Sequence, residues 1–220
     1  MGVLLMLMTI GGVLVAGILL VVAVVMKKAW LSTFVFGGVV VWFAFYFAML
    51  FGTSYSSGDK DLALGQPKKF CGFYLDCHLN AAVADVRRIA RIGNKSARGE
   101  FYIVKVHVFS DAGRATLSLG TVDAHVIDRT GQTYNRDMLA EGELPPQPEF
   151  GIKVGPESSF TKEIVFDLPA KVENPRLDLK AGSEVDRLIE TFLINDEDSV
   201  LHKRTYFKLE EPSTAEVKPL

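Results

Sequence analysis

Two long apolar runs near the start of the chain constrain its fold more than any other feature. They cover residues 2–26 and 31–51, and the only charges in the first 52 residues are Lys27 and Lys28, which lie between them. A helix needs roughly 20 apolar residues to cross the hydrocarbon core of a bilayer, and each run is long enough. The sequence therefore predicts a two-helix transmembrane hairpin over residues 1–52.

The lysine pair predicts the orientation of this hairpin. Lys and Arg side chains in short loops are retained on the cytoplasmic side of a membrane. Lys27 and Lys28 should therefore face the cytoplasm, with both chain ends on the other side. We expect a two-pass protein of the cytoplasmic (inner) membrane whose C-terminal domain is periplasmic or extracellular, with the lipid bilayer as one partner.

A cleaved signal peptide is the alternative interpretation of the first run. A secretory leader carries its positive charge before a shorter apolar core, whereas no Lys or Arg precedes Lys27, so retention is favoured. Five glycines allow the helix backbones to approach closely, as in a tight hairpin, although Gly is common in membrane helices in general. They are Gly11, Gly12, Gly17, Gly37 and Gly38.

Composition agrees with this division of the chain. Hydrophobic residues make up 49% and the mean hydropathy is +0.22, which is high for a soluble protein. The formal charge is −2, and because Lys27 and Lys28 contribute +2, the rest of the chain carries −4. A mildly acidic domain lacks the basic surface that nucleic-acid binding requires, so we expect no nucleic-acid partner.

The chain after the hairpin divides into three parts. Small polar residues and Gly over residues 53–69 predict a mobile or extended juxtamembrane linker. Residues 70–211 are about one domain's worth of chain and can build a core of their own. Residues 212–220 are expected to be a disordered tail.

Within residues 70–211 the apolar pattern has a period of two, and turn residues separate the runs. Seven such runs predict an antiparallel sandwich with little helix. In residues 101–109 we expect Tyr102, Val104, Val106 and Val108 to face the core and His107 to point outward. The predicted strands cover residues 83–89, 101–109, 122–127, 160–166, 176–180, 188–194 and 200–209.

Three stretches follow one another in a family-like order: GEFYIVKVHVFSDAG from residue 99, DAHVIDRTGQTY from residue 123 and VGPESSFTKEIVFDLP from residue 154. Over residues 82–180 the chain resembles a bacterial immunoglobulin-like domain family of unknown function, anchored by a lipid or a membrane span and sometimes labelled telomeric-repeat-binding-factor-like. The resemblance implies an immunoglobulin-like sandwich with an adhesive, scaffolding or ligand-sensing role and no catalytic residues. The matching residues are Asp128, Gly131 and Tyr134 in a hairpin, and Gly155, Phe166 and Pro169 in the later segment, where Gly155 precedes Pro156 in reverse of the family order.

The only two cysteines, Cys71 and Cys77, lie at the start of the outside domain. In an oxidising compartment they are expected to form a disulfide, with Gly72 as the hinge of the closed loop. Two reduced thiols are one alternative. A metal site formed by both cysteines with His78, and with Asp76 or a distant histidine, is the other, but this spacing is not typical of such sites.

Catalytic motifs are absent from the sequence. No nucleophile elbow, His-Glu-x-x-His or phosphate-binding glycine loop is present, and the four histidines are far apart in the chain, so we expect no enzyme, cofactor or metal. The acids at 196–198 could bind calcium but are more typical of a solvated hairpin tip. A two-span hairpin before a β domain is also the plan of cytochrome oxidase subunit two, but the cysteine spacing departs from that of its copper centre.

Residues 188–194 and 200–209 flank the acidic stretch and predict a final β-hairpin that either completes the sandwich or forms an interaction edge. Together these features indicate a membrane-anchored, non-catalytic module for protein binding or scaffolding. The alternative is an accessory subunit of a multi-subunit membrane complex, oxidase- or transporter-like, in which the hairpin makes the specific contacts.

Overall fold

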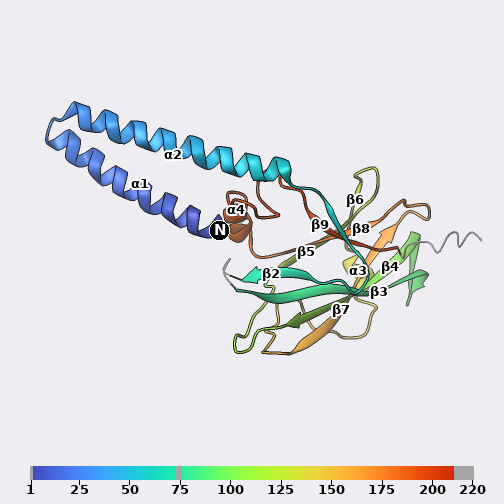
Figure 1. The fold of residues 1–220 in the computed structure, drawn as a ribbon. Helices are drawn as coiled ribbons and strands as arrows, with labels where there is room; N and C mark the ends of the chain where they lie inside the picture. The colour runs from blue at the N-terminus through green and yellow to red at the C-terminus, as the bar shows by residue number, and fades with distance from the viewer. Residues whose placement is uncertain (1, 73–75, 211–220) are drawn as a thin grey trace, which may run out of the picture. The chain divides into compact units, whose positions relative to one another are not determined.

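The structure, a computed structural model, describes residues 2–72 and 76–210 (Figure 1). The chain folds as two compact units. The hairpin unit contains the chain up to Gly58 and the segment Glu184–Arg204. The sandwich unit contains Asp59–Ser183 and the chain from Thr205.

Two long helices, α1 (Gly2–Val25) and α2 (Ala29–Ser56), run side by side in the hairpin unit (Figure 1). Leu, Ile, Val, Ala and Phe fill both, and neither contains a charged side chain. Both are long and apolar enough to cross a membrane. Lys27 adopts a positive φ of 52° in the turn that joins them.

Helix α2 does not end at Phe51, so the linker predicted for residues 53–69 is wrong in its first part. The helix continues to Ser56, and the buried Ser54 contacts Ser199 of the same unit. Strand β1 (Lys60–Leu62) follows and pairs with a strand from the end of the domain. Tertiary contacts order this segment despite its small polar residues, and composition alone does not reveal such contacts.

The sandwich unit contains two sheets that face one another. The five-stranded sheet has the order β1-β9-β8-β5-β6, and the four-stranded sheet has the order β2-β3-β4-β7. All described pairings are antiparallel except that of β1 with β9. The remaining strands are β2 (Lys68–Gly72), β3 (Asp76–Ile92), β4 (Lys95–Ser110), β5 (Val122–Ile127), β6 (Thr133–Asn135), β7 (Ser159–Leu168), β8 (Arg176–Ala181) and β9 (Thr205–Lys208).

Alternation along the strands builds the core between the two sheets, as the sequence predicts. On β4 the side chains of Tyr102, Val104, Val106 and Val108 are all buried in it. They meet residues of the opposite sheet such as Leu177 on β8. Removing this apolar surface from water is the main force that holds the two sheets together.

A second apolar cluster covers the outer face of the four-stranded sheet, and the sequence pattern does not predict it. Phe101 and Ile103, on the opposite side of β4 from the main core, pack with Val165 of β7 and Ala140. Ala140 belongs to the short helix α3 (Met138–Glu141), which follows β6. Strand β4 is therefore buried on both faces along this stretch, which explains why its outward residues are also apolar.

The hairpin predicted for residues 188–209 is wrong. Helix α4 (Glu184–Glu190) and a series of turns replace its first strand, and only β9 (Thr205–Lys208) remains of the second, pairing with β8 and β1. Leu193 and Ile194 are buried within the hairpin unit. The run has the composition of a strand in isolation. In the structure Ile194 packs instead against Leu5 of α1 and Tyr46 and Leu50 of α2.

The two units also divide the chain differently from the predicted 70–211 domain. The sandwich unit begins at Asp59 and leaves out Glu184–Arg204, which folds with the hairpin. The predicted tail, residues 212–220, and residues 73–75 of the cysteine loop lie outside the described residues.

Candidate functional site

Large apolar side chains project from the hairpin along most of its length. Phe34 is 75% exposed, and Leu14 of α1 and Val41 of α2 are exposed to a similar degree. A soluble protein does not leave a surface of this size bare to water. The hairpin therefore presents a large exposed apolar surface, which is the first candidate site.

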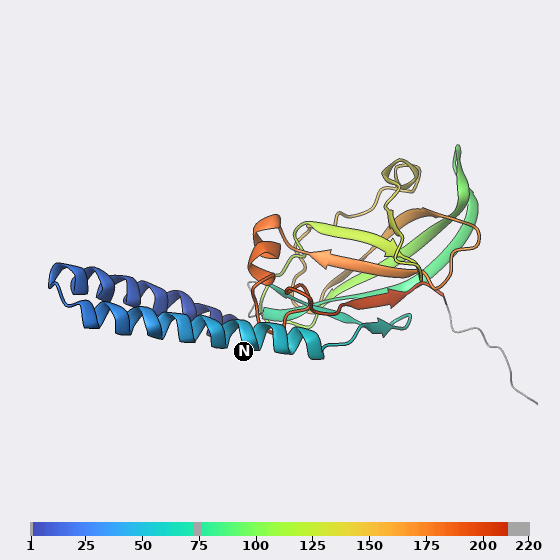
Figure 2. The same cartoon turned by 90° about the horizontal axis from the view of Figure 1, so that it is seen from above.

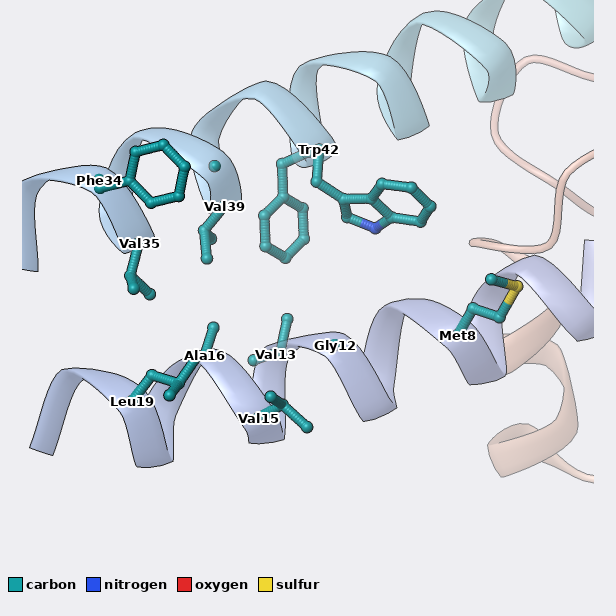
Figure 3. Close-up of a pocket in the computed structure, with 12 residues that line it drawn as sticks. Met8, Gly12, Val13, Val15, Ala16, Leu19, Phe34, Val35, Val39 and Trp42 are labelled. Carbon is teal, nitrogen blue, oxygen red and sulfur yellow. The ribbon is translucent and has the colours of Figure 1, made fainter. Parts of the chain in front are cut away.

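A groove of about 350 Å³ lies between α1 and α2 (Figure 3). Gly12 and Ala16 line it from α1, and Gly38 and Trp42 line it from α2. A methyl group added at Gly12 or Gly38 would meet nothing within 4 Å. The five hairpin glycines therefore do not bring the two backbones together, contrary to the tight hairpin that the sequence suggested, and they leave open apolar space instead.

The segment Glu184–Arg204, here called the cap segment, closes one end of the hairpin. The Tyr46 hydroxyl donates a hydrogen bond to the carbonyl oxygen of Phe192 at 2.6 Å. Ile194 packs against Tyr46, Leu50 and Leu5. The cap segment thus holds the N-terminal end of α1 beside the C-terminal part of α2.

Cys71 and Cys77 form a disulfide that joins β2 to β3. Because both sulfur atoms are engaged in this bond, neither is a thiolate ligand, and the metal site considered above has no cysteine donors. Across the described part of the chain, no group of three or more His, Cys, Asp or Glu side chains is arranged to hold a metal ion. The disulfide instead closes the edge strand β2 onto the sheet.

Asp128, Gly131 and Tyr134 meet in one turn between β5 and β6. The Asp128 carboxylate accepts hydrogen bonds from the N–H and hydroxyl of Thr130, the N–H of Gln132 and the hydroxyl of Tyr134, at 2.7 to 3.0 Å. These bonds, led by that from the Thr130 hydroxyl, hold the pKa of Asp128 below its usual value. Gly131 has a φ of +85°, a conformation that glycine adopts without steric cost. This is a structural turn.

The three later residues on which the resemblance depends also lie in structural positions. Phe166 of β7 is fully buried in the main core. Gly155 accepts a hydrogen bond from the N–H of Ser158 in the turn before β7. Pro169 directly follows the end of β7, and its carbonyl accepts from Val172.

Helix α3 presents a small apolar knob on the sandwich unit, and this is the second candidate site. Met138 is 64% exposed and Leu139 is 72% exposed. Asp137 caps the helix by accepting a hydrogen bond from Ala140 N–H at 2.9 Å. In Figure 2 the olive coil of α3 stands out from the sandwich. We call Met138 and Leu139 the α3 knob.

A largely buried ion pair holds the α3 knob in place. The Arg136 guanidinium donates to both carboxylate oxygens of Glu141, at 2.8 and 2.5 Å. Glu141 also accepts a hydrogen bond from the N–H of Val165 on β7 at 3.1 Å. The knob is thus tied to an edge strand by charge-assisted bonds, which are roughly twice as strong as neutral ones. Sequence reasoning missed it because a four-residue helix leaves no periodic signal.

The four histidines have separate partners. His78 Nδ1 lies 3.0 Å from Asp111 Oδ1, and His125 Nε2 lies 3.5 Å from Asp178 Oδ2. His107 stacks on Phe109 of its own strand. The fourth, His202, contacts the carbonyl oxygen of Lys203 in the cap segment. The structure therefore does not bring them together.

The acidic residues 196–198 lie in a turn of the cap segment and not at a hairpin tip. The Asp198 N–H donates to Asp196 Oδ1 at 3.0 Å. Burial raises the pKa of Asp196, and the negative charges of Asp198 and Glu197 raise it further. The hydrogen bond from the Asp198 N–H lowers this pKa but does not cancel the rise. The Asp196 carboxylate thus stabilises the turn, and Asp198 Oδ1 lies 3.8 Å from the guanidinium of Arg204.

Several solved structures are similar to this chain at low identity. MPT63, a secreted protein from Mycobacterium tuberculosis, is 14% identical over 58% of this chain and 100% of its own, with a TM-score of 0.40. The yjhA protein from Bacillus subtilis is 16% identical over 67% and 98%, with a TM-score of 0.43. An uncharacterised β-sandwich protein from Clostridium difficile is 9% identical over 70% and 97%, with a TM-score of 0.39. No protein-family model and no curated protein matches the chain. Similarity at this level carries no argument about function.

Proposed function

We propose that this chain is a two-pass membrane protein whose sandwich unit lies outside the cytoplasmic membrane and binds a protein partner without catalysis. The observation that carries the proposal is the exposed apolar surface of α1 and α2, represented by Phe34 at 75% exposure. A bilayer covers such a surface and satisfies the helices, whose backbone groups are bonded internally.

Two features support the orientation. Lys27 and Lys28 carry the only charges in the hairpin turn, and cationic residues of short loops stay in the cytoplasm. Cys71 and Cys77 are bonded to each other, and disulfides persist in oxidising compartments outside the cytoplasm. Both features favour the same side of the membrane for the sandwich unit.

The α3 knob is the surface that we assign to the partner. The exposed Met138 and Leu139 offer a protein partner apolar contact. The ion pair of Arg136 with Glu141 already holds the helix in place, so binding costs little additional conformational entropy in the side chains beneath it. The partner's matching surface is therefore expected to be an apolar pocket.

Site-specific photocrosslinking tests this assignment. A photoreactive amino acid at Leu139 should give a discrete crosslinked band in native membranes. The matched control is the same amino acid at Ile152, an exposed apolar residue of the same unit outside α3. A band at Leu139 that is absent at Ile152 supports binding at the knob, whereas equal bands or none at Leu139 contradict it.

A second candidate function is that of an accessory subunit whose hairpin makes the specific contacts. The groove beside Gly12, Ala16 and Gly38 favours it, because small residues allow another helix to approach closely (Figure 3). Replacing residues 1–52 with an unrelated two-span anchor separates the two proposals. Retained crosslinking at Leu139 favours the sandwich unit as the binding part, and its loss favours the hairpin.

A further inference from the structure

The cap segment exposes a run of large apolar side chains. Val185 and Leu188 of α4 are 66% and 63% exposed, and Phe192 in the following turn is 44% exposed. These three residues are spaced i, i+3 and i+7, so they share one side of a helical path. Leu201, later in the same segment, is 74% exposed.

Most of the charged residues of α4 are less exposed than its large apolar residues. Asp186, Arg187 and Glu190 are each only partly exposed, whereas Val185 and Leu188 are exposed, as is Glu184 at the start of the helix. A surface helix in water buries its apolar residues against the protein and exposes its charged ones. Val185 and Leu188 depart from that pattern, because they are more exposed than three of the four charged residues of α4.

The position of the cap segment along the hairpin indicates what its exposed apolar residues contact. A hydrocarbon core of about 30 Å corresponds to roughly 20 helical residues at about 1.5 Å per residue. Counted from the lysine turn, that length ends close to Leu5 on α1 and close to Leu50 on α2. Ile194 of the cap segment packs against these same two residues. The cap segment thus lies where the hairpin leaves the hydrocarbon core.

We propose that the cap segment is an interfacial membrane-binding element, which inserts Val185, Leu188, Phe192 and Leu201 into the acyl-headgroup boundary of the non-cytoplasmic leaflet. The occupant assigned to this apolar face is lipid because the cap segment packs on α1 and α2 at the level where the bilayer ends, and the exposed surface of those two helices is itself apolar. The inference rests on the proposed membrane anchoring of α1 and α2.

The carboxyl group of Glu190 fits such a position. Its Oε2 atom is buried without a hydrogen-bond partner within the described residues. Burial raises the pKa of Glu190 to about 7, and the nearby Asp196, Asp198 and Asp186 add to this rise. A carboxyl group that accepts a proton near neutral pH is less costly to hold beside a lipid boundary than one that stays charged.

Spin labelling of the full chain tests the proposal. Val185→Cys and Leu188→Cys each receive a nitroxide in nanodiscs of phosphatidylcholine and phosphatidylglycerol, without reductant. Cys71 and Cys77 are bonded to each other and take no label. Val21→Cys on the exposed face of α1 serves as the membrane reference, and Thr133→Cys on the exposed strand β6 serves as the water reference.

The readout is accessibility to oxygen, which concentrates in lipid, against accessibility to a water-soluble nickel chelate. We expect an oxygen-to-nickel ratio at residues 185 and 188 that is several-fold above that at residue 133 and approaches that at residue 21. A ratio equal to that at residue 133 overturns the proposal. Protection from both reagents also overturns it, because protein and not lipid then covers the face. If the ratio at residue 21 equals that at residue 133, the proposed membrane anchoring of α1 and α2 is itself contradicted, together with the proposal for the cap segment.

Discussion

The hairpin unit and the sandwich unit use the same apolar side chains in opposite ways. Phe166 of β7 has no exposed surface, whereas Phe34 of α2 is 75% exposed. Phe166 stabilises the fold by leaving water for the core, and Phe34 has no such role inside the chain. The sandwich buries its large apolar side chains within the chain, whereas the hairpin leaves many of its own exposed.

The largest expected effect tests this contrast directly. Phe166→Ala should lower the free energy of unfolding of the sandwich by about 3–5 kcal/mol, because it removes buried surface and leaves a cavity. The matched substitution Phe34→Ala should leave that free energy unchanged. Urea unfolding of the full chain in detergent, followed by the circular dichroism of the sheets, measures both. Equal losses would show that Phe34 supports the sandwich after all.

The ion pair beneath the α3 knob gives the next effect. Glu141→Gln removes the charge that pairs with Arg136 and should destabilise the sandwich by up to about 3 kcal/mol, since both side chains are largely buried. The matched control is Glu173→Gln, which removes a partner of the exposed Arg129 and should change the free energy by less than about 1 kcal/mol. The same urea titration measures both. Equal effects at the two sites would mean that burial does not strengthen the Arg136 pair.

The disulfide should contribute less, because it closes a short loop. Changing both Cys71 and Cys77 to Ser should lower the stability of the sandwich by about 2 kcal/mol through the freedom that the unfolded chain regains. Helices α1 and α2 should be unaffected. Thermal melts with and without reductant provide the check, and a wild-type midpoint that does not move on reduction would contradict it.

The smallest effects separate the two units by the sign of their pH dependence. The pKa of Asp128 is lowered in the sandwich, so its contribution to stability is present above the ordinary carboxyl pKa of 3.8 and is lost as pH falls below that value. The pKa of Glu190 is raised from 4.5 to about 7 in the cap segment, so the folded cap binds more protons and its packing strengthens as pH falls from about 7 toward 4.5.

Hydrogen-exchange protection factors measured between pH 8 and 5 test this prediction. Protection of the cap amides, such as Leu193 N–H bonded to the Glu190 carbonyl, should rise as pH falls, while the sheet amides stay constant. The groups around Glu190 are Asp186, Arg187, Asp196 and Asp198. Glu190→Gln keeps the shape and should abolish the rise. A rise that persists in this variant would assign it to Asp196.

The sequence predicts the parts of the fold that depend on local periodicity. Charge-free runs locate α1 and α2, and the alternation of valines with Lys105 and His107 over residues 104–108 predicts which side of β4 faces the core. Prediction from the sequence fails where an apolar run could pack either in a sheet or against helices. Residues 188–194 carry side chains that suit a strand, but Leu193 and Ile194 pack within the hairpin unit, and this choice depends on contacts remote in the sequence.

The candidate sites are less predictable than the fold. The pairing of Cys71 with Cys77, predicted from the cysteine count and an expected oxidising compartment, is present in the structure. The α3 knob does not, because its frame joins Arg136 and Glu141 to Val165, more than 20 residues away. The exposure of Val185 and Leu188 is also not predictable from the sequence, since a seven-residue helix does not reveal which of its sides is covered.

Cysteine labelling in intact cells tests the proposed topology most directly. Thr133→Cys on β6 and Ala29→Cys at the start of α2 place one thiol in the sandwich unit and one at the lysine turn. A membrane-impermeant maleimide should label residue 133 in intact cells and residue 29 only after the membrane is permeabilised. Labelling of residue 29 from outside, with residue 133 protected until permeabilisation, would contradict the two-pass orientation and the placement of the sandwich outside the cytoplasm.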